Sequence, residues 1–117
     1  MKMLSLIPDD DATRNALLGR TPTFSEFPVH IGRSPHMGLI LTYDAVSRTH
    51  CKISRSESGF TLTDMDSRNG SFLNGEKISQ GVGLFNDDVI RIACFRFRVS
   101  IFDDASLTRE VSTEESL

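Results

Sequence analysis

Tryptophan is absent from this sequence and tyrosine occurs once, so its eight phenylalanines must supply most of the aromatic packing. Cysteine is almost as scarce: Cys51 and Cys94 lie far apart, and neither has the nearby second ligand that a metal site requires. Both fall in apolar-rich segments, which predicts two buried free thiols. No apolar run approaches the ~20 residues of a membrane span, and MKMLSLI at the start is too short for a signal peptide. We therefore expect an intracellular, cytoplasmic protein with no membrane association.

A large excess of charge of either sign is also missing. The formal net charge of the 117 residues is −3. Residues 103–117 hold five acids and one base, a balance of −4 that leaves +1 for residues 1–102. A folded part so close to neutral argues against a nucleic-acid partner, because such proteins carry a clear basic excess. With 38% hydrophobic residues and the length of one domain, the chain can build a single core.

Alternation of apolar and polar residues with a period of two is the main structural signal. Residues 95–102 alternate in this way, which is typical of a strand with one face in water. Seven shorter apolar segments precede them, at residues 2–7, 27–32, 39–43, 50–55, 59–64, 81–84 and 88–93. Residues that favour turns separate these segments. The pattern predicts an all-β sandwich or barrel.

Two segments depart from the strand pattern. Residues 10–18 have a capping aspartate (Asp10 or Asp11), helix-forming residues and a following Gly19, so a turn of helix and an irregular loop are both compatible with them. Residues 105–117 are acidic and polar without a packing pattern, and we expect an acidic flexible tail or the start of a linker there. The predicted domain therefore spans residues 1–104.

The stretch Ser47-Arg48-Thr49-His50 contains residue types that occur in hydrolases and metal sites. A serine three residues before a histidine does not form a triad, because triad members meet in space with a third, orienting carboxylate. The glycine-flanked turn that exposes a nucleophilic serine is also missing. His30, His36 and His50 lie in different segments without the spacing of metal ligands. We expect no enzyme, metal or cofactor, and His50 fits a structural histidine that bonds to loop backbone.

Three loops that are not adjacent in the chain each offer hydrogen-bond donors. These are Arg33 after one strand, Ser47 and Arg48 before another, and Arg68 and Asn69 in a further tight loop. If the loops meet at one end of a sandwich, their donors converge on one small, strongly accepting group. A phosphoryl group fits, since it carries about −1.5 to −2 charges and three acceptor oxygens that guanidinium groups bind well. Taken singly, each arginine is better explained as a solvated surface residue.

Four motifs follow one another along the chain: Gly32-Arg33, the stretch Ser47–His50, DMDSRNGSFLNG at residues 64–75, and LFNDDVIRIA at residues 84–93. In this order and spacing they strongly resemble the forkhead-associated (FHA) domain. The resemblance covers about residues 29–102, with MKMLSLI as a first strand. It implies an FHA-type (SMAD/FHA) β-sandwich of about eleven mostly antiparallel strands in two sheets, whose loops at one end bind phosphothreonine peptides.

The resemblance also implies roles for individual residues. Arg33 would hold the phosphate or the adjacent peptide backbone, and Ser47 would donate its hydroxyl to a phosphate oxygen. Arg48 and Arg68 occupy positions that often reach the phosphate, and Asn69 would bond to the peptide main chain. Structural support is expected from a second set of residues: Gly32, His50, Gly70, Asn74 and Gly75.

Positive φ angles are expected at several turns. Asn69-Gly70 and Asn74-Gly75 would supply them at two turns, and for Asn74-Gly75 this is the whole role we expect. Asp87 and Ala93 stand where the family often has glycine, and aspartate tolerates positive φ better than most residues. Ser71 replaces the usual threonine of the family and keeps its hydroxyl.

The expected function is phosphorylation-dependent binding of other proteins in kinase signalling, without catalysis. Partners would be phosphothreonine-containing proteins, an attached domain, or the chain's own tail when Thr108 or Thr113 is modified. Nucleic acid and membranes are not expected as partners. The alternative is a docking domain of the same fold that binds proteins without any phosphate.

Overall fold

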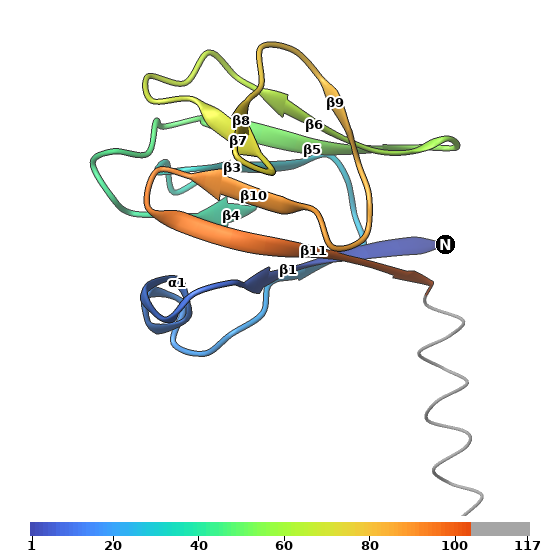
Figure 1. Ribbon diagram of the computed structural model, residues 1–117, viewed down its shortest axis with the longest axis horizontal. Coiled ribbons are helices and arrows are strands. Elements are labelled where there is room, and N and C mark those ends of the chain that lie inside the picture. The colour runs from blue at the N-terminus through green and yellow to red at the C-terminus, as the bar shows by residue number, and fades with distance from the viewer. Residues whose placement is uncertain (104–117) are drawn as a thin grey trace, which may run out of the picture.

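The computed structural model describes residues 1–103, which form two β-sheets (Figure 1). The six-stranded sheet has the order β2-β1-β11-β10-β7-β8, and the five-stranded sheet has the order β4-β3-β5-β6-β9. The strands are β1 (Lys2–Pro8), β2 (Thr23–Phe24), β3 (Val29–Gly32), β4 (Leu39–Ile40), β5 (Cys51–Ser56), β6 (Gly59–Asp64), β7 (Ser71–Leu73), β8 (Glu76–Lys77), β9 (Val82–Leu84), β10 (Val89–Ile92) and β11 (Phe95–Asp103). Among the described pairs only β3 and β4 run parallel. The prediction of about eleven mostly antiparallel strands in two sheets is confirmed. The expected tail at 105–117 lies outside the described residues.

The longest strand, β11, shows how the alternation in the sequence builds the sandwich. Phe95, Phe97 and Val99 are 0–2% exposed and face the second sheet. The residues between them, beginning with Arg96, point to the outer face of the sheet. β1 pairs along its whole length with β11, from Lys2 opposite Asp103 to Pro8 opposite Phe97. The first and the last strand of the described chain therefore lie next to each other.

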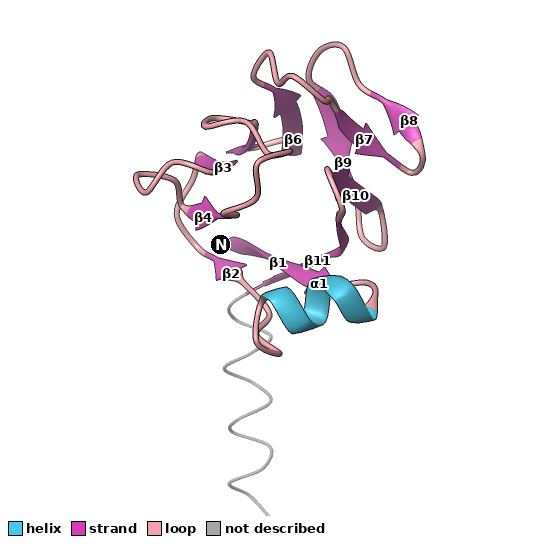
Figure 2. Cartoon of the chain, turned by 90° about the vertical axis from the view of Figure 1, so that its left-hand side faces the viewer, coloured by secondary structure: helices cyan, strands magenta, loops and turns pink. Residues whose placement is uncertain are grey.

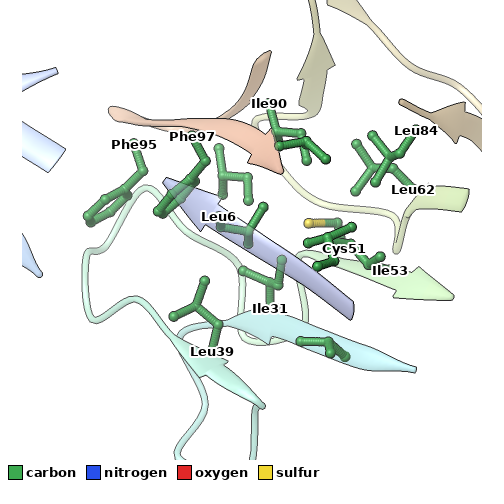
Figure 3. Close-up of a cluster of buried hydrophobic side chains, with 14 of the residues drawn as sticks. Leu6, Ile31, Leu39, Cys51, Ile53, Leu62, Leu84, Ile90, Phe95 and Phe97 are labelled. Atoms are coloured by element: carbon green, nitrogen blue, oxygen red, sulfur yellow. The ribbon is translucent and has the colours of Figure 1, made fainter. Parts of the chain in front are cut away.

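The core lies between the two sheets and consists mainly of aliphatic side chains (Figure 3). Leu6 and Ile90 of one sheet and Ile31, Ile53 and Leu62 of the other are all 0% exposed. Burial of each such side chain contributes roughly 1.5–3 kcal/mol to folding. Exposed ion pairs contribute at most about 1 kcal/mol each, so the packing between the sheets is the main stabilising term.

The two cysteines have different environments. Cys51 begins β5 and its sulfur lies among the core side chains, as predicted (Figure 3). Burial raises the pKa of its thiol to about 12. The prediction for Cys94 is wrong, because this residue is exposed in the turn between β10 and β11. Ala93, with φ of 53°, reverses the chain there and interrupts the strand to which Cys94 had been assigned.

The segment after β1 forms a short helix, α1 (Asp11–Ala16), so of the two structures that its sequence allows, the helical turn is the one that forms. The Asp10 carboxylate caps it by accepting a hydrogen bond from the Thr13 backbone N–H at 2.8 Å. Hydrogen bonding with the Thr13 side chain, and then with the Thr13 N–H, lowers the pKa of Asp10. The Thr13 hydroxyl accepts a bond from the Arg96 N–H, which holds α1 against the beginning of β11.

The connections that carry the predicted ligand-binding residues lie at one end of the sandwich. In Figure 1 the β3–β4, β4–β5 and β6–β7 connections lie on the left, as do α1 and the β10–β11 turn. The N-terminus and the last residues of β11 lie at the opposite end (Figure 1). Within residues 1–103, no helix is long and apolar enough to cross a membrane. No group of three or more metal-ligating side chains occurs in this part of the chain either.

Candidate functional site

The β3–β4 connection (residues 33–38) and the β4–β5 connection (residues 41–50) are held together through Gly32. A Cβ at this position would lie 2.2 Å from the Arg48 carbonyl oxygen, so only glycine permits this approach of the two backbones. The Arg33 N–H donates to the Ser47 carbonyl at 3.0 Å, and the Ser34 N–H donates to the Arg48 carbonyl at 3.2 Å. The two loops therefore form one backbone unit.

His50 joins this unit to the β6–β7 connection (residues 65–70). Its ring is 0% exposed, and its Nδ1 accepts a hydrogen bond from the Ser47 N–H at 3.1 Å. Its Nε2 lies 2.8 Å from the Gly70 carbonyl oxygen. Because Nδ1 accepts a bond, the ring hydrogen is on Nε2 and donates to Gly70. A single buried imidazole thus links two loops, and it has no ring nitrogen left for a ligand.

A second set of bonds shapes the β6–β7 connection from within. The Asp64 carboxylate accepts bonds from the Ser67 hydroxyl at 2.6 Å, the Ser71 hydroxyl at 2.7 Å and the Ser67 N–H at 3.1 Å. Ser67 Oγ in turn accepts the Gly70 N–H at 3.0 Å. Burial acts to raise the pKa of Asp64, but the bonds from Ser67 and Ser71 outweigh it and lower the pKa. The carboxylate stays ionised and holds the loop in one conformation.

The β6–β7 loop also bonds directly to the β4–β5 loop. Ser47 Oγ accepts a hydrogen bond from the Arg68 N–H at 3.0 Å. Asn69 Nδ2 donates to the Ala45 carbonyl at 2.8 Å. Ser47, Arg68 and Asn69, which are up to 22 residues apart in the sequence, are thereby neighbours in the structure.

The three arginines of the loops have free donors. Arg33 uses only its Nε, which donates to the Val46 carbonyl at 3.0 Å. The side chains of Arg48 and Arg68 are exposed and form no hydrogen bond or ion pair with any other residue among 1–103. Three other arginines in this part of the chain, Arg14, Arg96 and Arg98, each pair with an aspartate. The loop end of the sandwich is therefore able to bind an anion.

Two residues of the site escaped the sequence analysis, which assigned no role to Asp64 or Ser67. The available signal was their spacing, since an aspartate three residues before a serine is typical of a turn in which the carboxylate accepts backbone and hydroxyl hydrogens. The expectation for Asn74 was incomplete. Besides its positive φ of 51°, its amide bonds to Asp88 Oδ1 at 3.1 Å and to the Val89 N–H at 2.9 Å. Asn74 thus connects the β7–β8 turn to β10.

Positive φ angles occur at most of the expected turn positions. Gly70 has φ of 84° and Gly75 has φ of 87°, and Asp87 and Ala93 have φ of 71° and 53°. A positive φ angle was also expected at Asn69, as part of the pair Asn69-Gly70. Asn69 does not have one, so this part of the prediction is wrong. The Asn69 side chain bonds to Ala45, and the preceding residue with positive φ in this loop is Asp66.

A hollow of about 620 Å³ lies elsewhere, between the end of α1 and β4. Leu17, Leu18, Leu39 and Ile40 are among the residues that line it. None of the five predicted ligand-binding residues contributes to this hollow. Arg48, Arg68 and Asn69 are exposed on their loops, which suits contact with an extended chain.

Comparison with known proteins places the chain in a family. The model of the FHA domain matches residues 29–93. The chain belongs to the FHA family. Its β-sandwich resembles that of Mycobacterium tuberculosis EmbR in complex with a low-affinity phosphopeptide, with a TM-score of 0.74 and 26% identity; the match covers 84% of this chain and 24% of that one. It also resembles an FHA domain whose interactions depend on phosphothreonine, with a TM-score of 0.73 and 29% identity over 86% of this chain and 98% of that one.

Among curated relatives, the FHA domain-containing protein FhaB of Mycobacterium tuberculosis is 39% identical over 70 residues. This match covers 60% of the present chain and 45% of FhaB. The chain therefore spans less than half the length of this relative. The match of the FHA model, residues 29–93, includes the described loops.

Proposed function

We propose that this FHA domain binds phosphothreonine peptides and so mediates phosphorylation-dependent protein–protein interaction in kinase signalling. The observation that carries the proposal is the set of loop arginines without acidic partners, Arg33, Arg48 and Arg68, on loops that are bonded to one another and that also carry the Ser47 hydroxyl. The complex of EmbR with a phosphopeptide supports phosphopeptide binding by this chain.

In the proposed complex the phosphate takes the place of solvent at the free donors. The terminal nitrogens of Arg33 and the hydroxyl of Ser47 bind phosphate oxygens, and Arg48 and Arg68 close around the remaining oxygen. Ser47 Oγ already accepts the Arg68 N–H, so its own hydrogen is free to be donated. The loop backbone is held by Gly32 and His50 before any ligand binds, which reduces the entropy cost of binding.

Asn69 is placed to bind the main chain of the peptide beside the phosphothreonine. One of its amide hydrogens is used by the Ala45 carbonyl. The second amide hydrogen and the amide oxygen remain, and together they match the acceptor and donor of one peptide unit. The bond to Ala45 fixes the direction of the side chain, so Asn69 is oriented in the free domain.

The binding energy in this proposal comes mainly from hydrogen bonds between ionised groups. Each contributes about 1.5–3 kcal/mol net, roughly twice the value of a neutral bond. Exposed charges are screened by salt, so affinity must fall as ionic strength rises. Affinity must also rise between about pH 5 and 7, because the second ionisation of the phosphate has a pKa near 6.

No catalytic step belongs to the proposal, and FHA domains are interaction modules. The partners are proteins that a kinase has modified on threonine, including an attached domain or the chain's own tail at Thr108 or Thr113. Both cysteines are free thiols, which agrees with a reducing, cytoplasmic location.

The test is a titration of the domain with a degenerate phosphothreonine peptide library and with the same library without phosphate. We expect binding to the phosphorylated library alone, and a loss of at least tenfold in Ser47→Ala and in Arg33→Ala. Ser58→Ala is the matched control, since Ser58 is exposed in the β5–β6 turn at the far end of the sandwich, and its affinity should be unchanged.

Equal affinity for both libraries would refute the proposal and favour a docking domain that needs no phosphate. Phosphate-dependent binding that survives both Ser47→Ala and Arg33→Ala would place the site elsewhere on the domain. Enriched residues on either side of the phosphothreonine would identify the class of partner.

A further inference from the structure

The outer face of the six-stranded sheet has a one-sided charge distribution. On β1, β7, β8, β10 and β11 the side chains that alternate with the core positions point away from the second sheet. None of these outward positions holds a carboxylate. Four of them hold a cation, namely Arg91, Arg96, Arg98 and Lys77. The protein as a whole is acidic, so this concentration of cations is local.

Three of the four cations lie in one row across the strands. Arg96 is opposite Arg91, Arg91 is opposite Phe72, and Phe72 is opposite Lys77. Neighbouring strands are about 4.8 Å apart, so the row extends over roughly 14 Å. Figure 2 shows the strands concerned, β8, β7, β10 and β11, in succession along one side of the molecule. We call Arg91, Arg96, Arg98 and Lys77 together the basic face.

The charges of the basic face are only partly neutralised. Arg98 pairs with Asp87 at 3.0 Å, and Arg96 lies 3.7 Å from Asp9. The Arg91 guanidinium lies over the Phe72 ring at 4.0 Å, and neither it nor Lys77 forms an ion pair with a carboxylate of residues 1–103. Like charges directly opposite each other on a sheet, as Arg91 and Arg96 are, destabilise it. An anionic partner would relieve this repulsion.

The chain itself contains a segment of matching charge and sufficient length. Residues 104–117 hold four acids, Asp104, Glu110, Glu114 and Glu115, against one base, Arg109. This segment follows β11, the strand that carries Arg96 and Arg98. β11 is paired with β1 at residues 97–103 and with β10 at residues 95–98, so the segment reaches the basic residues of the face by crossing over β11.

The lengths agree with such a return path. Arg96 lies seven residues before Asp103, or roughly 24 Å along the strand. Glu110 lies seven residues after Asp103, so an extended segment that turns back reaches the level of Arg96 at Glu110. Glu114 and Glu115 then extend far enough to meet Arg91 and Lys77. Exposed ion pairs are individually weak, but a tether of this length keeps the acids at an effective concentration in the millimolar range.

We propose that the acidic segment 104–117 docks on the basic face, with Glu110, Glu114 and Glu115 bound to Arg91, Arg96 and Lys77. This contact is separate from the phosphate-binding loops and requires no phosphate. It therefore stands or falls independently of the proposed phosphothreonine binding.

The test uses the full chain labelled with ¹⁵N and the native Cys94, which is exposed in the turn that joins β10 to β11. A nitroxide attached there lies beside Arg91 and Arg96, while the buried Cys51 thiol does not react. We expect at least twofold loss of amide signal intensity in residues 108–116 at low salt. The loss should disappear in about 0.5 M NaCl, where charges are screened within a few ångströms.

Two variants and one control label decide the outcome. Arg91→Gln combined with Arg96→Gln should abolish the signal loss, as should replacement of Glu110, Glu114 and Glu115 by glutamine, which leaves residues 1–103 unchanged. A nitroxide on Lys52→Cys, in a Cys94→Ser background, lies on the outer face of the opposite sheet and should leave the segment unaffected. No loss from Cys94, equal loss from position 52, or a loss that survives both sets of substitutions would overturn the proposal.

Discussion

Gly32→Ala is the substitution that most directly examines how the binding loops are held. The new methyl group would lie 2.2 Å from the Arg48 carbonyl oxygen and 2.9 Å from that of Ser47. An ordinary contact between carbon and oxygen is at least about 3.3 Å, so the Ser47–Arg48 backbone must move by about 1 Å. Gly32 itself has no positive φ, so the contact and not the backbone conformation is the cause of the strain.

The cost follows from the contacts that this movement disturbs. The hydrogen bonds from the Arg33 and Ser34 N–H groups to Ser47 and Arg48 end on the displaced backbone. Loss of two backbone bonds at about 0.5–1.5 kcal/mol each, with overpacking of about 1–3 kcal/mol, destabilises the domain by roughly 2–6 kcal/mol. Domains of this size have a total stability of about 5–15 kcal/mol, so the loss is a large fraction of it.

Urea unfolding followed by circular dichroism measures this loss, and Gly83→Ala is its matched control. Gly83 also lies in a strand, and its added methyl group would meet only the Phe85 ring, which is 71% exposed and free to turn aside. We expect Gly83→Ala to change the unfolding free energy by less than about 0.5 kcal/mol. Equal midpoints for the two variants would refute the view that the backbone contact at Gly32 holds the loops.

Three further substitutions or reactions probe other parts of the structure. Asp64→Asn should lower the unfolding free energy by about 1.5–3 kcal/mol at pH 7, since the carboxylate accepts three bonds. Because its pKa is lower in the folded state, this difference from the wild type should persist above about pH 4 and shrink as the pH falls further, in urea titrations at each pH. His50→Ala should destabilise the domain by about 3 kcal/mol through two lost bonds and a cavity, whereas His36→Ala in an exposed loop should have an effect below about 0.5 kcal/mol. In the native protein a thiol reagent should modify Cys94 alone, and Cys51 only after unfolding, as peptide mass spectrometry would show.

For each of these three predictions, one experimental result would contradict the physical reason given. A constant difference for Asp64→Asn from pH 7 to pH 2 would mean that the charge of the carboxylate does not matter. Equal stability of the two histidine variants would remove His50 as the link between loops. Modification of Cys51 at the same rate as Cys94 would show that the core opens readily.

The sequence analysis located eight of the eleven strands, including the short β4 and β9, and missed β2, β7 and β8. β11 was expected at 95–102 and spans Phe95–Asp103. β2, β7 and β8 have only two or three residues each and lie next to residues that favour turns. They form by pairing with a neighbour, β2 with β1, β7 with β10 and β8 with β7. Cys94 was misplaced because a strand pattern continues through the turn at Ala93 without interruption in composition.

For the candidate site, the sequence identified the loops and their donors but not the bonds that arrange them. The resemblance to the FHA family pointed to Ser47 and Arg68, whereas the contact between the Ser47 hydroxyl and the Arg68 N–H depends on two loops 21 residues apart. Asp64 is different, because its spacing from Ser67 is a local signal, whereas the contact between the loops of Ser47 and Arg68 has none. Long-range geometry of this kind is set by the packing of the sheets and leaves no local pattern.

The pairing of β1 with β11 affects how the protein is made. The two strands lie about 100 residues apart in the chain, so one side of β1 has no partner until residue 103 has left the ribosome. At about 5–20 residues per second, roughly 5–20 s pass between the synthesis of β1 and that of β11. Leu4 and Leu6, which are fully buried in the finished sandwich, are exposed during this interval. The core therefore closes in a late step of synthesis, and a chain that stops before β11 presents an apolar strand edge on which other chains can aggregate.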